Sequence, residues 1–494
     1  MNLQANSGPQ RAKCVMVLGT SSGAGKSWLA TALCRHYARQ GLKVAPFKAQ
    51  NMSNNARVVA SPGGSGEIGS AQYFQALAAR AEPDVRMNPL LLKPEADTRS
   101  QVVMLGQVDA ELSAMPWRGR SEKVWPRIAQ ALDDLRAEYD VVVIEGAGSP
   151  AEINLMASDI VNLRVARAAD ARCLLVTDID RGGAFAHLYG TWALLPEADR
   201  ARIDGFVLNK FRGDATLLAP APEQLEQLTG VPTVATLPMW WQHGLPEEDG
   251  VFDDRSRSQG AVTRTVAVVA YPRLSNLDEF QPLKNIPGLR LVWARSPAEL
   301  AGADWIVLPG SKHTSSDLAW LREQGLDRAI ADHAGQGGSV LGICGGLQML
   351  GEALIDTHGV DGNAPGLGLL PLVTQFDPDK TVQRTQAGFG DLAGAWSALS
   401  GVAVQGYEIH HGQTAQHPAM AAAGDIAREV LPGLAWQNER GNVLGCYLHG
   451  LFEDPAVLQA LFGAAAPTLD SVFDGLADYL EQHIAPGLLD ALIA

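Results

Sequence analysis

Short runs of apolar residues alternate with longer helical patterns along most of this chain. The runs in its first half lie at 14–19, 43–48, 139–148, 171–179 and 203–210. Near-continuous apolar strands separated by helices are typical of a parallel sheet that is covered on both faces. In such folds the chemistry takes place beyond the carboxyl ends of the strands. The alternation therefore predicts an α/β fold and directs attention to the loops that follow the strands.

The alternation breaks once, near the middle of the 494 residues. Prolines accumulate after residue 213, and a charged stretch follows at 247–260. A second series of apolar strands then begins. We therefore expect two doubly wound, mostly parallel-sheet domains at 1–255 and 264–460, with a C-terminal helical tail at 461–494.

The composition excludes several classes of protein. The chain has 54 acidic and 39 basic residues, so its net charge of −15 disfavours nucleic acid and anionic membranes as partners. No apolar run approaches the length of a membrane span, and the first one, at 14–18, is too short for a signal peptide. Five cysteines without a CxxC pair favour a reducing cytoplasm and make structural zinc unexpected. We therefore expect a cytoplasmic chain.

The segment GTSSGAGKS (19–27) lies between the first expected strand and a helix. A strand, a glycine-rich turn, Lys-Ser and a helix form the context of a phosphate-binding loop, because backbone N–H groups and the helix N-terminus bind anions. A plain glycine turn is the alternative. Thr20 stands where the strict motif has its first glycine, and Gly19 comes one residue earlier. The residues expected to bind ATP here are Gly19, Thr20, Gly23, Gly25, Lys26 and Ser27.

Such a loop needs oxygen ligands for magnesium, and a few further polar residues are placed to serve the nucleotide. Ser27 and Glu145, which ends the strand VVVIE, are the expected ligands, with Glu67 as the second acid. Lys48 ends another strand and is expected to neutralise a carboxylate or the γ-phosphate. Asn209 ends the strand 203–210 and is expected to read the adenine edge. For each of them a solvated loop residue is the alternative.

The second domain carries a cysteine in a tight turn. In SVLGICGGLQMLG (339–351) a strand leads through Cys344 into a helix, which is the pattern of a nucleophile elbow. The helix N-terminus favours the thiolate. The backbone N–H of Gly345, with Gly310 and Ser311 in LPGSKHT, is expected to bind an oxyanion. Cys344 is therefore the expected nucleophile.

A nucleophilic cysteine needs a base, and His449 is the first candidate. His449 ends a strand of the same expected sheet, so it can meet Cys344 at the strand ends. His410 and His411 in GYEIHHG compete for this role.

Together these segments resemble the glutamine-dependent cobyric acid synthases of the cobalamin pathway, which join a P-loop NTPase-like domain to a class I glutamine amidotransferase-like domain. The resemblance covers about residues 14 to 460. The segments that make it specific are FKAQNMSNN (47–55) and DIDRGGAFA (178–186), and others are EIGSAQ (67–72), EGAGSPAEINL (145–155), GICGGLQMLG (342–351) and HGLFED (449–454).

The resemblance implies an activity. Cys344 would attack the side-chain amide of L-glutamine and form a γ-glutamyl thioester, while His449 moves protons. ATP with Mg²⁺ would activate the b, d, e and g carboxylates of adenosylcobyrinic acid a,c-diamide, a corrinoid, for attack by the released ammonia. The resemblance implies no tightly bound prosthetic group, and it leaves a homo-oligomer open.

One position departs from the pattern of triad amidotransferases, which have a glutamate two residues after the histidine. Leu451 stands there, and the nearest acid is Glu453. We expect a Cys–His dyad whose third member is open, with Glu408 as one candidate.

Three rival functions stay open. The synthase that makes the a,c-diamide joins the same two domains, and a dethiobiotin-synthetase-like carboxylase shares the first domain and its loop. A partition-type ATPase switch has a lysine five residues before the loop lysine, where this chain has Ser21.

Overall fold

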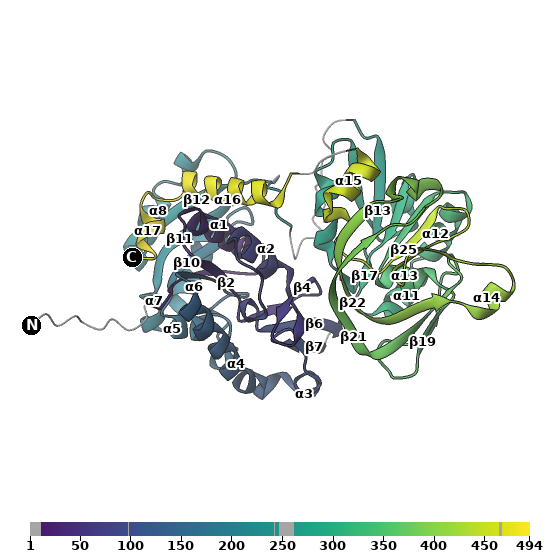
Figure 1. Ribbon diagram of the computed structural model, residues 1–494. Helices are drawn as coiled ribbons and strands as arrows, with labels where there is room; N and C mark the ends of the chain where they lie inside the picture. Colours follow the sequence, from purple (N-terminus) through teal and green to yellow (C-terminus); the bar gives the residue numbers. More distant parts are fainter. Residues whose placement is uncertain (1–10, 97, 242, 247–260, 464–466) are drawn as a thin grey trace, which may run out of the picture.

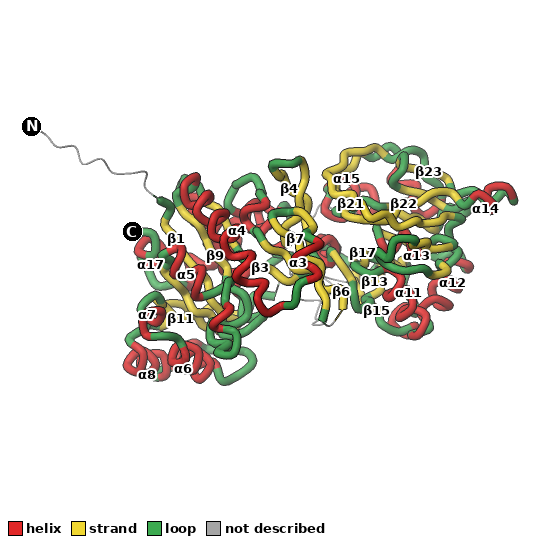
Figure 2. The backbone as a smooth tube through the Cα atoms, turned by 90° about the horizontal axis from the view of Figure 1, so that it is seen from below, coloured by secondary structure: helices red, strands yellow, loops and turns green. Residues whose placement is uncertain are grey.

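The computed structural model describes residues 11–96, 98–241, 243–246, 261–463 and 467–494. Two α/β domains lie side by side in Figure 1, and the view from below in Figure 2 separates them again. This confirms the expected fold class. The expected boundary between the domains falls on residues 247–260, which lie outside the described part.

A six-stranded, wholly parallel sheet forms the centre of the first domain. Its order is β12 (Thr233–Pro238), β11 (Ile203–Phe211), β10 (Arg172–Asp178), β1 (Lys13–Gly19), β9 (Val141–Glu145) and β2 (Val44–Phe47). Along β1, Met16 and Leu18 enter one core and Val15 and Val17 enter the other. The sheet is therefore buried on both faces, which explains its unbroken apolar strands.

Helices cover both faces of this sheet. The core on one face includes residues of α4, α5, α6 and α8, and the core on the other includes α1 and α2. The bounds are α1 (Lys26–Arg39), α2 (Ser70–Ala78), α3 (Ala110–Ala114), α4 (Trp117–Glu138), α5 (Leu163–Ala169), α6 (Ala184–Leu194), α7 (Glu197–Arg200) and α8 (Ala221–Thr229).

Short strands of the first domain form a layer that faces the second domain. They are β3 (Gln50–Met52), β4 (Ala56–Ser61), β5 (Gly64–Gly69), β6 (Leu90–Ala96), β7 (Arg99–Met104) and β8 (Gln107–Val108). β4 and β5 pair as a hairpin, and the other four form a sheet in the order β3-β6-β7-β8. In Figure 2, β4, β6 and β7 lie between the two central sheets.

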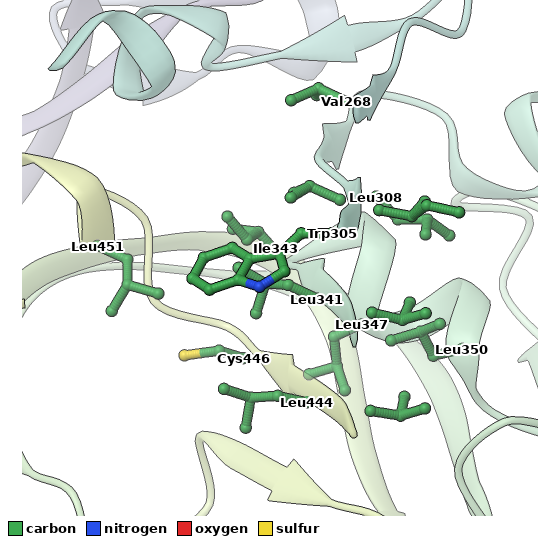
Figure 3. Packing of buried hydrophobic residues seen from close by; sticks show 14 of the residues in the cluster. Val268, Trp305, Leu308, Leu341, Ile343, Leu347, Leu350, Leu444, Cys446 and Leu451 are labelled. Atoms are coloured by element: carbon green, nitrogen blue, oxygen red, sulfur yellow. The ribbon is translucent and has the colours of Figure 1, made fainter. Parts of the chain in front are cut away.

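The second domain has a seven-stranded sheet that is parallel from β15 to β25 and antiparallel at one edge. Its order is β15 (Leu289–Ala294), β13 (Arg264–Val269), β16 (Trp305–Leu308), β18 (Ser339–Ile343), β25 (Val443–Cys446), β24 (Ala435–Gln437) and β23 (Arg428–Leu431). Figure 3 shows Trp305, Ile343 and Leu347 in the apolar core that supports the strand ends.

Helices, and one further sheet, surround these strands. The helices are α9 (Gln281–Lys284), α10 (Pro297–Leu300), α11 (Thr314–Glu323), α12 (Leu326–Gly335), α13 (Gly345–Leu350), α14 (Pro418–Ala422) and α15 (Pro455–Phe462). The further sheet is β20 (Ala364–Pro365), β19 (Ala353–Asp356), β21 (Leu372–Gly388) and β22 (Ala403–Gln416), and β14 (Leu274–Ser275) pairs with β17 (Gly310–Ser311). The long β21 and β22 reach the β4–β5 hairpin of the first domain.

The end of the chain returns to the first domain. α16 (Leu469–His483) lies along α1 in Figure 1, and α17 (Leu488–Ala491) follows it. Phe473, Leu476 and Leu480 enter the core that α1 shares, and Arg35 of α1 donates to Asp474 at 2.7 Å. The expected helical tail is thus a packed layer of the first domain. None of the helices described in the structure combines the length and the apolar character that crossing a membrane requires.

Candidate active sites

The loop between β1 and α1 has the shape of an anion cradle. Gly25 precedes α1 with φ of 102°, a backbone conformation that glycine adopts readily. The side chain of Lys26 is buried and folds back along the loop, where its ammonium donates to the carbonyl oxygens of Ser21 at 2.9 Å and Gly148 at 3.2 Å. A Cβ on Gly19 would lie about 3 Å from this side chain. The loop therefore surrounds the Lys26 ammonium, which can bind phosphate oxygens.

Glu145 at the end of β9 joins three side chains beside this loop. Its Oε1 accepts hydrogen bonds from Ser27 Oγ and Lys48 Nζ, both at 2.8 Å, and its Oε2 accepts one from Gln75 Nε2 at 2.6 Å. Burial raises the pKa of Glu145, but the charge of Lys48 and these hydrogen bonds outweigh burial and hold the pKa below its ordinary value. Glu145 is therefore ionised beside the helix that carries the loop lysine.

The donor set at this point suits magnesium. Ser27 and Glu145 offer a hydroxyl and a carboxylate oxygen, which are the ligands that a hard cation prefers together with nucleotide phosphates. Within the described ranges, His, Cys, Asp and Glu residues form no group of three or more that could hold a metal ion by themselves. Magnesium would thus depend on the phosphates of the nucleotide as further ligands.

Glu67 lies elsewhere, in β5 at the boundary with the second domain. One of its oxygens binds Lys93 of β6 and the other binds Lys380 of β21. Burial raises the pKa of Glu67, but the two lysines lower it to about 2. Burial in turn lowers the pKa of Lys93 to about 7. The side chain expected as the second magnesium ligand thus has both oxygens occupied by ammonium groups in this structure.

Asn209 contacts the phosphate loop with its side chain. Its Nδ2 donates to the carbonyl of Ala24 at 2.9 Å, and the neighbouring Lys210 donates to the carbonyl of Gly23 at 2.9 Å and to Asp178 at 3.2 Å. A hollow next to this strand end is lined by Ile179, Asp180, Phe211 and Arg212. Asn209 therefore holds the loop, and adenine reading by this residue stays a prediction.

Cys344 occupies a strained turn at the end of β18. It has φ of 51° and ψ of −106°, outside the conformations that L-residues ordinarily adopt. Its backbone N–H donates to the carbonyl of Cys446 at 2.8 Å, and its Sγ lies 3.7 Å from the carbonyl oxygen of Ile409 in β22. This is the geometry of a nucleophile elbow, with the sulfur held at the N-terminus of α13.

The residues expected to supply oxyanion donors lie close to the turn after Cys344 and to His449. A Cβ on Gly345 would lie 2.8 Å from the backbone N of Ser311, so the β17 loop closely approaches the turn after Cys344. The Ser311 hydroxyl donates to Asp317 at 2.6 Å, which holds the loop in place. A Cβ on Gly310 would lie 2.9 Å from Cε1 of His449. The structure thus brings Gly310, Ser311 and Gly345 together around Cys344.

His449 is the histidine that meets Cys344. Burial lowers the pKa of His449, but the charge of Glu279, followed by the charge of Cys344 and its hydrogen bond, outweighs burial and raises the pKa to about 10. The Nδ1 of His449 lies 3.2 Å from Oε1 of Glu279, and Oε2 of Glu279 accepts the N–H of Gly450 at 3.0 Å. His449 is therefore protonated at neutral pH and lies next to the sulfur of Cys344.

The other candidates of the second domain have different partners. Glu408, one candidate for the acid that orients His449, instead binds His410 at 3.2 Å and accepts a hydrogen bond from Gln383 at 2.8 Å. His410 stacks on Tyr447, and His411 binds a backbone carbonyl with a pKa that burial and nearby lysines lower to about 4. Neither histidine competes with His449 in this arrangement.

Sequence reasoning missed two side chains. Glu279 lies 170 positions before its histidine, in a short 3₁₀ turn that carries no motif. Gln75 lies one turn beyond the EIGSAQ segment and contacts Glu145. Glu279 is one of two acids inside the short turn Leu277–Phe280, which is a weak signal, so only the tertiary contact reveals its role.

Comparisons with known families divide the chain in the same way. Residues 15–247 match the family described as CobQ/CobB/MinD/ParA nucleotide binding domain, and residues 265–457 match the CobB/CobQ-like glutamine amidotransferase domain. A solved glutamine amidotransferase covers 40% of this chain and 99% of its own, at 16% identity and a TM-score of 0.30.

Curated relatives extend the match over nearly the whole chain. Cobyric acid synthase of Variovorax paradoxus (strain S110) is 80% identical over 483 residues, which cover 98% of this chain and 99% of that protein. The cobyric acid synthase of Acidovorax ebreus (strain TPSY) is 78% identical over 491 residues, 97% of this chain and 99% of that protein. The chain therefore belongs to the cobyric acid synthase family.

Proposed function

We propose that this chain catalyses the ATP- and glutamine-dependent amidation of the b, d, e and g carboxylates of adenosylcobyrinic acid a,c-diamide, giving adenosylcobyric acid. The observation that carries the proposal is the pairing of two complete reaction centres in one chain. Cys344 with His449 forms one centre, and Lys26 with Ser27 and Glu145 forms the other. Membership in the cobyric acid synthase family supports the choice of substrate.

The cysteine centre releases ammonia from glutamine. The thiolate of Cys344 attacks the side-chain amide carbon, and the N–H groups of Ser311 and Gly345 stabilise the negative oxygen. Protonated His449 then delivers a proton to the leaving nitrogen, so that ammonia departs and a γ-glutamyl thioester remains. Water, which gives its proton to the now neutral His449, attacks the thioester and releases glutamate.

The phosphate loop activates the acceptor. We propose that Lys26 and the loop N–H groups bind the ATP phosphates and that Lys48 steers the corrinoid carboxylate towards the γ-phosphate. Ser27 and Glu145 would hold magnesium, which would supply positive charge that offsets the charge of the ATP phosphates. The adenine of ATP would lie in the hollow that Phe211 helps to line. The substrate carboxylate attacks the γ-phosphorus, ADP leaves and an acyl phosphate forms. Ammonia then attacks the acyl carbon and displaces phosphate, which takes up the released proton, and the amide remains.

Several features support a small-molecule enzyme of the cytoplasm over a DNA- or membrane-bound switch. The net charge is −15, and the five cysteines are free and buried. Both reaction centres, moreover, lie at the carboxyl ends of parallel strands, where other α/β domains bind their ligands.

Mass spectrometry of the corrinoid product tests this proposal. The purified chain is incubated with the a,c-diamide, ATP, magnesium and glutamine. Four added amides support cobyric acid synthesis. No gain with this acceptor but two amides gained from cobyrinic acid would instead assign the chain to the rival that makes the a,c-diamide, and the absence of any ATP-dependent amidation would reject both.

A further inference from the structure

A buried arginine of the first domain crosses to the second. Arg57 lies in β4 and is 2% exposed. Its guanidinium donates to both carboxylate oxygens of Glu453, at 2.8 and 2.5 Å, and to Asp278. Both acids belong to the glutamine amidotransferase domain. Two parallel bonds to one carboxylate orient both groups, so this contact is directional as well as attractive.

The two acids bound by Arg57 adjoin the residues that act on glutamine. Asp278 directly precedes Glu279 in the 3₁₀ turn Leu277–Phe280. Glu453 ends another 3₁₀ turn, Leu451–Glu453, which follows His449 after one glycine. Arg57 thus binds the two short segments that carry the proton-transfer residue and its orienting acid.

A third contact reaches the histidine ring itself. Tyr407 stacks on His449 with ring centroids 5.3 Å apart, and the guanidinium of Arg57 lies 5.0 Å from the centre of the Tyr407 ring. The Tyr407 hydroxyl accepts a hydrogen bond from Asn276 at 2.7 Å, and the same Asn276 amide donates to the carbonyl of Ala56 at 3.2 Å. The backbone next to Arg57 is therefore linked through Asn276 to Tyr407, which stacks on His449.

Charge makes this arrangement dependent on the arginine. Asp278 and Glu279 are buried side by side, and Glu453 lies close to both, since each of their charges acts on its pKa. Without Arg57, these three neighbouring carboxylates would lose the guanidinium that binds two of them. Repulsion between buried like charges would then displace the turn that carries Glu279.

The segment that carries Arg57 begins at the other reaction centre. Lys48, nine positions earlier, directly follows β2 and binds Glu145 beside the phosphate loop. One short stretch of the first domain thus contacts both the acid of the ATP site and the acids behind His449.

We propose that Arg57 is a positioning residue for glutamine hydrolysis, supplied by the domain that consumes the ammonia. Through Asp278 and Glu453 it holds Glu279 and His449 in their working geometry. The inference rests on the proposed roles of Cys344 and His449. This role of Arg57 means that glutamine hydrolysis reaches its full rate only when the first domain is docked at β4. Ammonia is then released mainly when the domain that consumes it is in place.

The test uses the full chain with Arg57→Met and reads the two nitrogen sources separately. We expect the kcat of glutamine hydrolysis to fall about 10- to 100-fold, as for other residues that orient a catalytic group. The KM for glutamine and the rate of ammonia-driven amidation should stay within about twofold, since Arg57 contacts neither substrate in the proposal. Arg57→Lys keeps the charge but loses the paired bonds, and it should recover part of the rate.

Arg384→Met is the matched control. Arg384 of β21 also reaches the first domain, where it donates to the carbonyl of Val58 and to Glu82, both at 3.2 Å, but it is half exposed and binds neither turn next to His449. Its substitution should leave the ratio of glutamine-driven to ammonia-driven amidation unchanged.

A double variant separates positioning from general damage. If Arg57 acts through Glu279, then Arg57→Met combined with Glu279→Gln should lose less than the product of the two single losses. Multiplicative losses, an unchanged kcat in Arg57→Met, or an equal loss with both nitrogen sources would each overturn the inference. Should Arg57→Met fail to fold, Arg57→Lys and Glu453→Gln replace it with the same ratio as readout. Glutamine-driven turnover that survives in Cys344→Ser would instead overturn the proposed function.

Discussion

Glu279 holds His449 at two points. One carboxylate oxygen lies 3.2 Å from the Nδ1 of the ring, and the other accepts the backbone N–H of Gly450 at 3.0 Å. Glu279 and His449 are both at most 1% exposed. The carboxylate therefore orients the ring towards Cys344, and its charge raises the pKa of His449 against the effect of burial. The acid that a triad needs comes from a turn far away in sequence.

Glu279→Gln keeps the shape of this acid and removes its charge. The pKa of His449, about 10 in the intact site, should fall, because Glu279 is the main group that raises it while Cys344 supplies the rest. The protonated ring is the working form and is lost as pH rises, so the alkaline limb of kcat/KM for glutamine should move to lower pH. At neutral pH we expect a loss of about 10- to 100-fold. Glutamine hydrolysis measured from about pH 6 to about pH 11 checks this, with ammonia-driven amidation as the control. An alkaline limb that stays in place would contradict it.

Cys344→Ser should abolish amidation with glutamine and retain amidation at high ammonia concentration. At neutral pH a serine hydroxyl is a far weaker nucleophile than a cysteine thiolate, whereas the substitution leaves the phosphate loop unchanged. The measurement is the rate of corrinoid amidation with each nitrogen source. Equal loss with both sources would show that the second domain does not serve to release ammonia.

Lys26→Ala should remove amidation with either nitrogen source. The lysine lies in the cradle that is proposed to bind the phosphates, and its charge offsets that of the transferred group, so the effect should exceed about 100-fold. Turnover is measured as above, and circular dichroism verifies the fold. Unchanged turnover would reject activation of the substrate at this loop.

Glu67→Gln should destabilise the chain, because two buried ammonium groups lose their partner. Breaking a buried ion pair costs about 3–5 kcal/mol, and Glu67 serves both Lys93 and Lys380. The pKa of Glu67 is lowered to about 2, so the intact chain should also lose stability as the pH falls from about 4 towards about 2. Denaturant unfolding of both chains at neutral and acidic pH measures this.

The same variant distinguishes the two roles of Glu67. A magnesium ligand would show itself as a raised magnesium requirement for amidation with little change in stability. The ion-pair role expects the reverse, a lower denaturation midpoint with an unchanged magnesium requirement.

Much of the molecule could be predicted because local pattern and fold agree. Apolar runs such as 14–19 and 139–145 can be buried only in a sheet that is covered on both faces. These two runs form β1 and β9 of such a sheet. The glycines before Lys26 and after Cys344 permit tight turns that few other residues allow, so both loops were evident without coordinates. The elbow pattern indicated Cys344, and the expected strand order made His449 the first candidate for its base, while His410 and His411 stayed open.

The rest depends on contacts between distant segments. The short strands β3 to β8 lack a strong hydrophobic period because they form the boundary between domains, and some charges there pair across it, as Glu67 does with Lys380. The helix α16 showed an apolar face, but only the folded chain assigns that face to α1.

By itself the sequence determined two α/β domains, a phosphate loop around Lys26 and a cysteine elbow at residue 344, since each of these follows from short-range chemistry that neighbouring residues dictate. The tertiary structure alone decided that Glu279 orients His449 and that Gln75 contacts Glu145. It also decided that Arg57 binds Asp278 and Glu453. These contacts join residues from separate elements, and no spacing along a chain records which buried charges will meet once the domains dock.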